Sequence, residues 1–117
     1  MYMGEYEHLT RELIGVTEDI SSITKTVSVV LLTSKDKDIA YIGKKLYELG
    51  KDLLASISFP DMVEDLDDKV TYLGSLIEDC ESYGAADAVI DDLKEAYQNG
   101  KDALNDYAQS WARVHVG

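Results

Sequence analysis

Cysteine, proline and long apolar runs are almost absent from this sequence of 117 residues. Cys80 is the only cysteine, so no disulfide can form within the chain, and we expect its thiol to be a small buried hydrophobe. The longest apolar run, Val29–Leu32, is far too short to span a membrane. Residues 1–7 are acidic and lack the apolar core of a signal peptide. These absences lead us to expect a cytoplasmic protein with no membrane partner.

Cations are also scarce. The chain has 11 Lys and Arg residues against 23 Asp and Glu residues, which gives a formal net charge of −12. Duplex nucleic acid and anionic membranes both select clusters of Lys and Arg, so we expect neither as a partner. The hydrophobic share of 45% and the charged share of 29% are ordinary for a folded soluble domain. At this length we expect a single domain over residues 1–117 that folds without a disulfide or a metal.

Hydrophobic periodicity is the strongest positive signal. Apolar side chains recur in alternating steps of three and four, the spacing of a narrow helix face that packs against partner helices. The pattern predicts helices over residues 8–33, 38–57, 61–83 and 86–114. Residues 23–32 are rich in Thr, Ser and Val and are also compatible with a strand, but the unbroken upstream period favours helix. The stripe positions are Leu9, Leu13, Val16, Ile20, Ile23, Val27 and Val30; Ile39, Ile42, Leu46, Leu49 and Leu53; Val63, Leu66, Val70, Leu73, Ile77 and Cys80; and Ala86, Ile90, Leu93, Tyr97, Gly100, Leu104, Tyr107, Trp111 and Val114.

Short segments with helix-capping and helix-stopping residues separate the stripes. Residues 34–38 form a charged turn in which Ser or Asp can cap the next helix. Pro60 cannot continue the helix before it, and Asp61 with Glu64 has the spacing of a capping box. Gly84 suits the left-handed conformation that ends many helices. Connections this short place neighbouring helices antiparallel, so we predict an all-α fold, a four-helix up-and-down antiparallel bundle.

Two glycines lie inside predicted helices. Asn99-Gly100 is a turn dipeptide, but the apolar stripe passes through it in phase, so we expect a continuous or slightly kinked helix. Gly50 lies 50 residues earlier, in a faint repeat of Lys-x-x-Tyr-x-x-Gly-Lys-Asp-x-Leu that begins at Lys44 and again at Lys94. The repeat fits a tandem pair of helical hairpins and equally fits two amphipathic hairpins aligned by periodicity. Because glycine within a helix costs about 1 kcal/mol relative to alanine, we expect both glycines to mark close helix crossings.

Metal-binding patterns are weak. A di-iron bundle needs inward-pointing carboxylates on all four helices and two Glu-x-x-His motifs. The chain has one such match, Glu5-x-x-His8, and its second histidine is His115. No stripe position carries Asp or Glu, so we expect a dry core with no bound metal and no cofactor. Antiparallel topology would place both termini at one end of the bundle, which by itself does not indicate a site.

Carboxylates on both sides of the third connection partly resemble the Mg²⁺ ligands of all-helical nucleotide pyrophosphohydrolases. That family holds the ion with Glu-x-x-Glu on one helix and Glu-x-x-Asp on a neighbour, an arrangement that suits hard cations. The second pair here has the reverse order, and no Lys or Arg is placed to meet phosphates, so a solvated acidic face is the favoured interpretation. No nucleophile with a base and no Gly-rich phosphate loop is present, and we expect no catalytic residues. The candidate ligands are Glu78, Glu81, Asp92 and Glu95.

Tyrosines and spare apolar residues suggest association. Eight Tyr against one Phe is unusual, and Tyr and Trp suit interfaces because they combine an apolar body with a polar tip. The apolar face near Val29 to Leu32 is wider than a four-helix core needs. We therefore expect a homo-oligomer; the alternative is that the rings cover the edges of a monomer core. The interface candidates are Val29, Leu31, Leu32, Tyr47, Tyr97 and Trp111.

The second predicted helix resembles a known family. Its pattern Ile42-x-x-x-Leu46-Tyr47-x-Leu49-Gly50-x-x-Leu53 is similar to Ile-Gln-x-x-Leu-Phe-x-Leu-Gly-Ala-x-Leu of the ATP:cob(I)alamin adenosyltransferases. Ala103-Leu104-Asn105 is similar to part of that family's Tyr-Leu-Asn-Arg-Leu-Ser-Asp segment. The resemblance implies a helical bundle that forms trimers, with ATP and cobalamin bound between subunits. The family's Thr-x-x-Gly-Asp-x-Gly-x-Thr nucleotide loop and arginine-rich stretch are absent, so shared fold and assembly are implied more strongly than adenosyl transfer.

The sequence favours a non-enzymatic, self-associating interaction or scaffold protein with a broad acidic surface. This hypothesis depends on four dry stripes, spare apolar and Tyr-rich surface, and the lack of convergent catalytic residues. Two alternatives belong to other classes. One is a diverged adenosyltransferase-like bundle that binds a nucleotide or a corrinoid and forms a trimer. The other is a Mg²⁺-dependent nucleotide pyrophosphohydrolase-like bundle.

Overall fold

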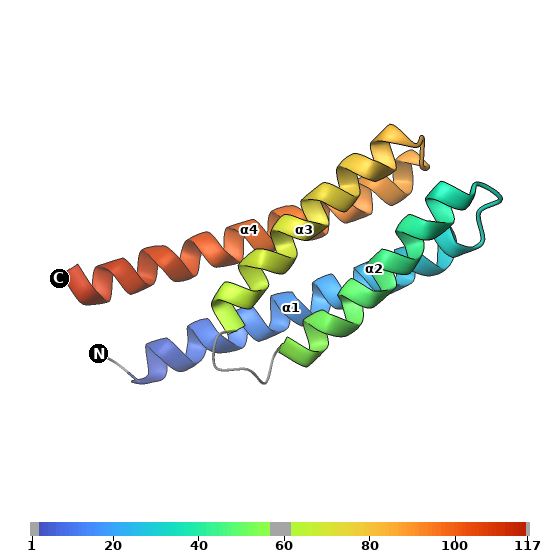
Figure 1. The fold of residues 1–117 in the computed structure, drawn as a ribbon. Helices are drawn as coiled ribbons and strands as arrows, with labels where there is room; N and C mark the ends of the chain where they lie inside the picture. Colours follow the sequence, from blue (N-terminus) through green and yellow to red (C-terminus); the bar gives the residue numbers. More distant parts are fainter. Residues whose placement is uncertain (1–2, 57–61, 117) are drawn as a thin grey trace.

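Four long helices make up the chain in this computed structural model, which describes residues 3–56 and 62–116 (Figure 1). Side chains are described for residues 10–55 and 63–109. The predicted all-α fold is confirmed, because the described residues form four helices that pack against one another and contain no strand. The helices are α1 (Met3–Leu32), α2 (Lys37–Ser56), α3 (Met62–Ser82) and α4 (Asp87–Val116).

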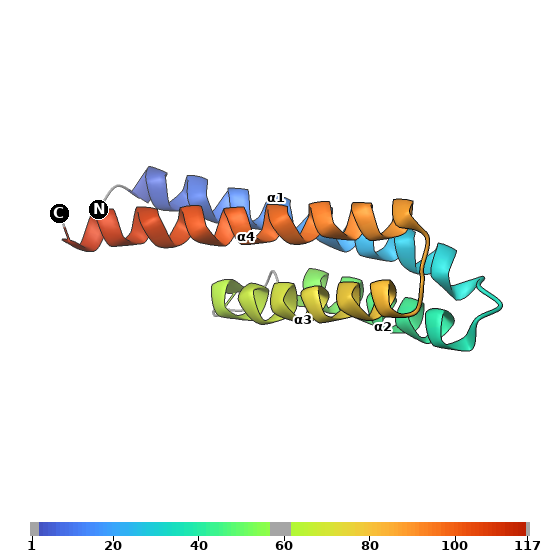
Figure 2. The same ribbon diagram turned by 90° about the horizontal axis from the view of Figure 1, so that it is seen from above.

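The helices form an elongated up-and-down bundle. Each helix packs against the next in sequence, and α1 also packs against α4, which closes the bundle. Seen from above, α1 and α4 form one layer and α2 and α3 form the other (Figure 2). The molecule measures 54 × 22 × 18 Å, because α1 and α4 are each 30 residues long. The beginning of α1 and the end of α4 lie at the same end of the bundle, as antiparallel topology predicts (Figure 1).

The connection between α1 and α2 uses the capping chemistry that the sequence predicts. Asp36 Oδ1 accepts hydrogen bonds from the backbone N–H groups of Asp38 (2.9 Å) and Ile39 (3.4 Å), which have no partner within the first turn of α2. The acidic side chain thereby fixes where α2 begins. The other predicted cap, Asp61, lies outside the described residues, as does Pro60.

Helix α3 ends at a left-handed glycine, as predicted. Gly84 has φ 76°, a conformation that a side chain with a Cβ adopts only at a cost. The N–H of Ala85 donates to the C=O of Cys80 at 2.9 Å, and the N–H of Gly84 donates to the C=O of Glu81 at 3.3 Å. This pair of bonds is the Schellman motif, and it turns the chain sharply into α4.

Two segments of uncertain type are helical, as predicted. Residues 23–32 belong to α1, although they are rich in β-branched residues, and α4 runs without a break through Asn99-Gly100. In both segments an apolar face in helical phase can be buried against a neighbouring helix. That burial outweighs the local preference for a strand or a turn.

The face of α1 that is buried differs from the one that its apolar residues predict. The predicted stripe and the buried face share Leu13, Ile20 and Val27, but Val30 is 56% exposed and Leu31 is 3% exposed. The α1–α2 connection projects beyond the α3–α4 connection (Figure 1), so the end of α1 is covered by α2 and not by the other hairpin. Placing Val30 in the core and Leu31 on an interface was therefore wrong.

A line of small polar residues on α1 is buried, which the apolar stripe did not reveal. Each hydroxyl donates to a backbone carbonyl, so burial leaves none of them unpaired. Three of these bonds lie within α1, and the fourth runs from Ser21 Oγ to the C=O of Gly50 in α2 at 2.7 Å. The four residues are Thr17, Ser21, Thr24 and Ser28.

Glycines opposite this line bring α1 and α2 into close contact. A Cβ placed on Gly43 would lie 3.0 Å from the backbone nitrogen of Leu32, and one on Gly50 would lie 2.8 Å from Oγ1 of Thr24. Gly100 of α4 is equally crowded, since a Cβ there would lie 2.8 Å from a methyl group of Val70. The prediction that Gly50 and Gly100 mark close crossings is confirmed.

The remaining core follows the predicted stripes on α2 and α3 with few changes. Ala96 of α4 is fully buried although the predicted stripe did not include it, and Ala86, which the stripe did include, lies just before α4 and is exposed. Among the side chains that the structure describes, no buried residue carries a charge. Within the same part of the chain, no helix has an apolar stretch long enough to cross a bilayer.

Candidate functional site: a groove between α1 and α4

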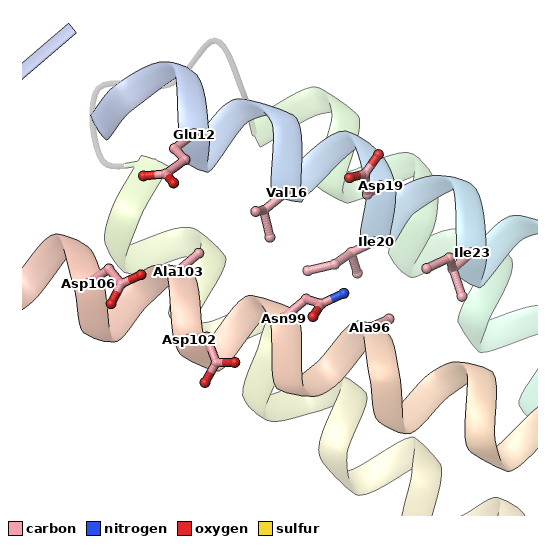
Figure 3. A pocket seen from close by; sticks show the side chains of 10 residues that line it. All are labelled: Glu12, Val16, Asp19, Ile20, Ile23, Ala96, Asn99, Asp102, Ala103 and Asp106. Atoms are coloured by element: carbon pink, nitrogen blue, oxygen red, sulfur yellow. The ribbon is translucent and has the colours of Figure 1, made fainter. Parts of the chain in front are cut away.

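Two neighbouring hollows lie along the line where α1 meets α4. The first has a volume of about 220 Å³ and extends along α1 from Glu12 to Ile23 (Figure 3). The second has a volume of about 270 Å³ and extends along α1 from Ser22 to Val27. Ile23 lines both hollows, so they are neighbours, and we call the two together the α1/α4 groove.

The floor of the α1/α4 groove is apolar. Ile20 packs against Gly100, because a Cβ placed on Gly100 would lie 3.0 Å from Cδ1 of Ile20. Helices α1 and α4 therefore come close together below the groove. Val16 and Ile23 lie on either side of Ile20 along α1 and are half-buried (Figure 3). Figure 3 shows Val16 and Ile20 pointing from α1 toward α4, and Asn99 pointing from α4 toward α1. The floor consists of Val16, Ile20, Ile23, Val27, Ala96 and Ala103.

Carboxylates from both helices line the walls of the groove. On α4 they follow the same three–four spacing as the apolar stripe, with Asn99 in the middle position, and on α1 they are seven residues apart. All six are exposed, and no Lys or Arg is among the described residues that line the groove. The carboxylates are Glu12, Asp19, Asp92, Glu95, Asp102 and Asp106.

This combination determines which ligands the groove favours. Carboxylates of one sign around a concave apolar surface create a negative potential that attracts cations and repels anions. An apolar floor between two helices offers burial to the side chains of a third element. The groove thus presents carboxylates, an amide, the hydroxyls of Ser22 and Thr26, and an apolar floor.

The structure separates the four candidate Mg²⁺ ligands. Asp92 and Glu95 line the α1/α4 groove, whereas Glu78 lines a different hollow of about 480 Å³ between α3 and α4. Glu81 Oε1 lies 3.6 Å from Nζ of Lys94, and both side chains are about half exposed. Among the described side chains, no group of three or more His, Cys, Asp or Glu residues is placed to hold a metal ion.

The interface candidates lie in several places. Val29 and Leu32 are exposed at the end of α1, and Val29 is 58% exposed. Tyr47 is exposed on α2, whereas Tyr97 is half-buried. The ring of Tyr97 packs over Gly74, and a Cβ placed on Gly74 would lie 2.8 Å from that ring. Leu31 belongs to the core, and the side chain of Trp111 lies outside the described residues, as do those of His8 and His115.

Cys80 is fully buried, which confirms its predicted role as a small hydrophobe. Burial raises the pKa of its thiol to about 11, and the nearby carboxylates of Asp79 and Glu81 act in the same direction. The thiol is therefore protonated at neutral pH and unsuited to act as a nucleophile.

The acidic stripe of α4 is the feature that sequence reasoning missed. Asp92 and Glu95 were interpreted as the second of two carboxylate pairs beside the third connection, although continuing the same three–four steps leads to Asn99, Asp102 and Asp106. That continuation was visible in the sequence. The opposite wall of the groove was not visible there. Glu12 and Asp19 are far from α4 in the sequence, and only the packing of α1 against α4 brings them to the same groove.

Comparison with protein-family models, with curated proteins and with solved structures finds no match for this chain. The resemblance to ATP:cob(I)alamin adenosyltransferases stays a prediction. Of the residues in its second segment, Ala103 and Leu104 are half-buried in α4 and Asn105 is exposed. Ala103 also forms part of the groove floor.

Proposed function

We propose that this protein is a non-enzymatic interaction protein that binds a positively charged amphipathic helix in the α1/α4 groove. We also propose that it acts in the cytoplasm. One observation carries the proposal: an apolar floor lies between carboxylates from two helices, with no cation among its described lining residues. A helix with apolar residues at i, i+3, i+4 and i+7 would bury that face on the floor, and its Lys or Arg residues would meet the walls.

The apolar floor and the acidic walls have different roles in this binding. The carboxylates are exposed, and exposed ion pairs are worth only about 0.2–1 kcal/mol each. The affinity therefore depends mainly on burial of the floor, at about 25 cal/mol per Å² of apolar surface. The charges accelerate association and exclude acidic partners. The same walls disfavour a triphosphate, which needs cationic or backbone donors, so the groove supports peptide binding over nucleotide binding.

A synthetic peptide tests the proposal directly. The probe is a helical peptide of Leu and Lys, with Leu at i, i+3, i+4 and i+7, and its binding is measured by titration calorimetry. We expect a dissociation constant of about 1–100 μM at low salt, which corresponds to about 5–8 kcal/mol. Raising the salt from about 50 mM to about 500 mM should weaken binding because it screens the exposed carboxylates.

Charge reversal in the groove has a matched control. The double variant Asp102→Lys/Asp106→Lys should weaken peptide binding by about tenfold or more, since it places cations in the wall. Glu48→Lys/Asp52→Lys makes the same change in net charge at the same spacing on α2, where both side chains are exposed. If the two variants weaken binding equally, the peptide responds only to net charge and the proposal is wrong.

The apolar floor is tested without any change in charge. Ala103→Phe should fill the hollow and abolish binding, because Ala103 is half-buried on the floor. Ala108→Phe places the same ring on an exposed position of α4 and should leave the affinity unchanged. Equal affinity in both variants would contradict docking in the groove.

A further inference from the structure

The end of the α1–α2 hairpin has a charge opposite to that of the groove. We call residues 29–45 the α1–α2 tip. This segment holds four of the 11 Lys and Arg residues of the chain but only two of its 23 Asp and Glu residues. One of those two, Asp36, already accepts hydrogen bonds from the first turn of α2. The lysines are Lys35, Lys37, Lys44 and Lys45.

The same tip exposes apolar side chains. Val29, Val30 and Leu32 are exposed in the last turn of α1, and Tyr41 is exposed in the first turns of α2. Val29 and Val30 are neighbours in the last turn of α1 and form its exposed apolar face. The tip is thus a positively charged helix end with an apolar face, which is the chemistry that the groove favours.

No bending of the chain can bring this tip into its own groove. The groove floor from Val16 to Val27 and the last turn of α1 from Val29 onward lie on one unbroken helix, so the tip cannot fold back over the floor. The α1–α2 connection also projects beyond the α3–α4 connection (Figures 1 and 2), so the tip extends away from the body of the bundle. The two complementary surfaces can therefore meet only between different molecules.

We propose that the helix bound in the α1/α4 groove is the α1–α2 tip of a second copy of this chain. The inference rests on the proposed function and names its partner. Val29 and Val30 of one copy would lie on the apolar floor of the next, and Lys35 and Lys37 would meet the carboxylate walls. This contact joins two different surfaces, so it is head-to-tail and forms either a closed ring or an open chain of subunits.

Charge reversal on each surface, and then on both, tests the contact. Sedimentation velocity over a range of concentrations should show that the wild-type chain forms species larger than the 13.0 kDa monomer. Lys35→Glu/Lys37→Glu should weaken self-association by about tenfold or more, and so should Asp102→Lys/Asp106→Lys. The chain that carries all four substitutions should associate more strongly than either double variant, because the reversed tip residues again face residues of opposite charge at positions 102 and 106 of the groove.

Matched controls separate the contact from a general effect of charge. Lys51→Glu/Lys94→Glu makes the same charge change as the tip variant at two exposed lysines outside the tip and the groove, and it should leave self-association unchanged. Circular dichroism should show the same helix content in every variant. If the control weakens association as much as the tip variant does, or if the fourfold variant associates no more strongly than the two double variants, the tip-to-groove contact is wrong.

A mixing experiment determines the stoichiometry. The Ala103→Phe chain keeps its tip and loses its groove, whereas the Lys35→Glu/Lys37→Glu chain keeps its groove and loses its tip. Each should be monomeric alone, and their mixture should form a 1:1 complex that does not grow further. A mixture that stays monomeric would overturn the inference.

The inference and the proposed function can fail separately. The Lys35→Glu/Lys37→Glu chain has an intact groove, so its titration with the Leu/Lys peptide tests the groove alone. If the wild type stays monomeric at high concentration while this variant binds the peptide, the second copy is not the partner and the proposed function stands. If the variant does not bind the peptide either, both are wrong. Displacement of wild-type assemblies by the peptide would support both.

Discussion

At the scale of single residues, the buried hydroxyls of α1 show how a polar side chain can belong to an apolar core. Ser21 and Thr24 are almost completely buried, but each donates a hydrogen bond to a backbone carbonyl. A satisfied hydroxyl loses little on burial, and its small size allows the backbones of α1 and α2 to approach. Small polar residues therefore fit here where larger apolar ones would force the helices apart.

The hydrogen bond between α1 and α2 should contribute measurably to stability. Ser21→Ala removes the donor to the C=O of Gly50 and should lower the free energy of unfolding by about 0.5–1.5 kcal/mol in urea titrations. Ser75→Ala is the control, because that hydroxyl is exposed and bonds within α3 to the C=O of Tyr72. A change of less than about 0.5 kcal/mol is expected there. Equal losses in the two variants would show that the bond between the helices has no special role.

The buried thiol of Cys80 should make stability depend on alkaline pH. The folded thiol has a pKa of about 11 against 9.0 for a free thiol, so between these values the folded state keeps a proton that the unfolded state has released. The free energy of unfolding should therefore fall as pH rises through this range, by about 1–3 kcal/mol for two pKa units.

The variant Cys80→Ala isolates this effect from the titration of Lys and Tyr. It should be less stable than the wild type at neutral pH, because it leaves a small cavity. The stability difference between the two proteins should narrow between pH 9 and pH 11, the window set by the raised pKa. A constant difference across that range would contradict the burial of a protonated thiol.

At the scale of helices, glycines on α2 set the distance between α1 and α2. A Cβ on Gly43 would lie 3.0 Å from the backbone nitrogen of Leu32 and 3.1 Å from the carbonyl oxygen of Ser28. Backbone atoms cannot rotate aside as a side chain can, so the two helices would have to separate along their contact. The close pairing of this hairpin also positions α1 for its contact with α4.

Two alanine substitutions should have opposite effects on stability. Gly43→Ala should lower the free energy of unfolding by about 1–3 kcal/mol, because the added methyl group overpacks the contact between α1 and α2. Gly15→Ala in α1 should raise it by up to about 1 kcal/mol, since a Cβ there meets nothing within 4 Å and alanine favours helix. Thermal and urea unfolding of the two variants provide the measurement, and stabilisation by Gly43→Ala would contradict the close approach.

At the scale of the whole molecule, charge is distributed very unevenly. The chain has a net charge of −12, yet the α1–α2 tip holds more Lys than Asp. The groove collects six exposed carboxylates with no cation among its described lining residues. Like charges three or four residues apart on one helix each cost a few tenths of a kcal/mol. The isolated bundle thus carries electrostatic repulsion that a bound cationic partner would relieve.

Screening that repulsion should stabilise the protein. Raising the NaCl concentration from about 20 mM to about 500 mM should increase the melting temperature of the dilute protein, because the Debye length falls below the spacing of the groove carboxylates. Glu12→Gln/Asp106→Asn should show a higher melting temperature at low salt and a smaller rise with salt. If salt lowers the melting temperature of the wild type, repulsion in the groove is not a significant cost. Dilution matters, because self-association also adds to stability.

The order of residues alone determined the number of helices, their approximate bounds and their antiparallel course. These features depend on local chemistry, such as the periodicity of apolar residues, the cap at Asp36 and the left-handed stop at Gly84. Each of these signals influences only the residues close to it in the sequence. The close approaches at Gly50 and Gly100 followed from the same reasoning, because a glycine inside a helix has a known cost.

Only the tertiary structure decided which side of α1 is buried and what the acidic residues form together. Leu31 is buried and Val30 is exposed, the opposite of what we expected, because the end of α1 packs against α2 and extends beyond α4. Glu12 and Asp106 lie at opposite ends of the sequence, and each alone is an ordinary carboxylate on a solvated helix face. They become walls of one groove because helix packing brings distant segments side by side, and periodicity along a single helix carries no information about its neighbours.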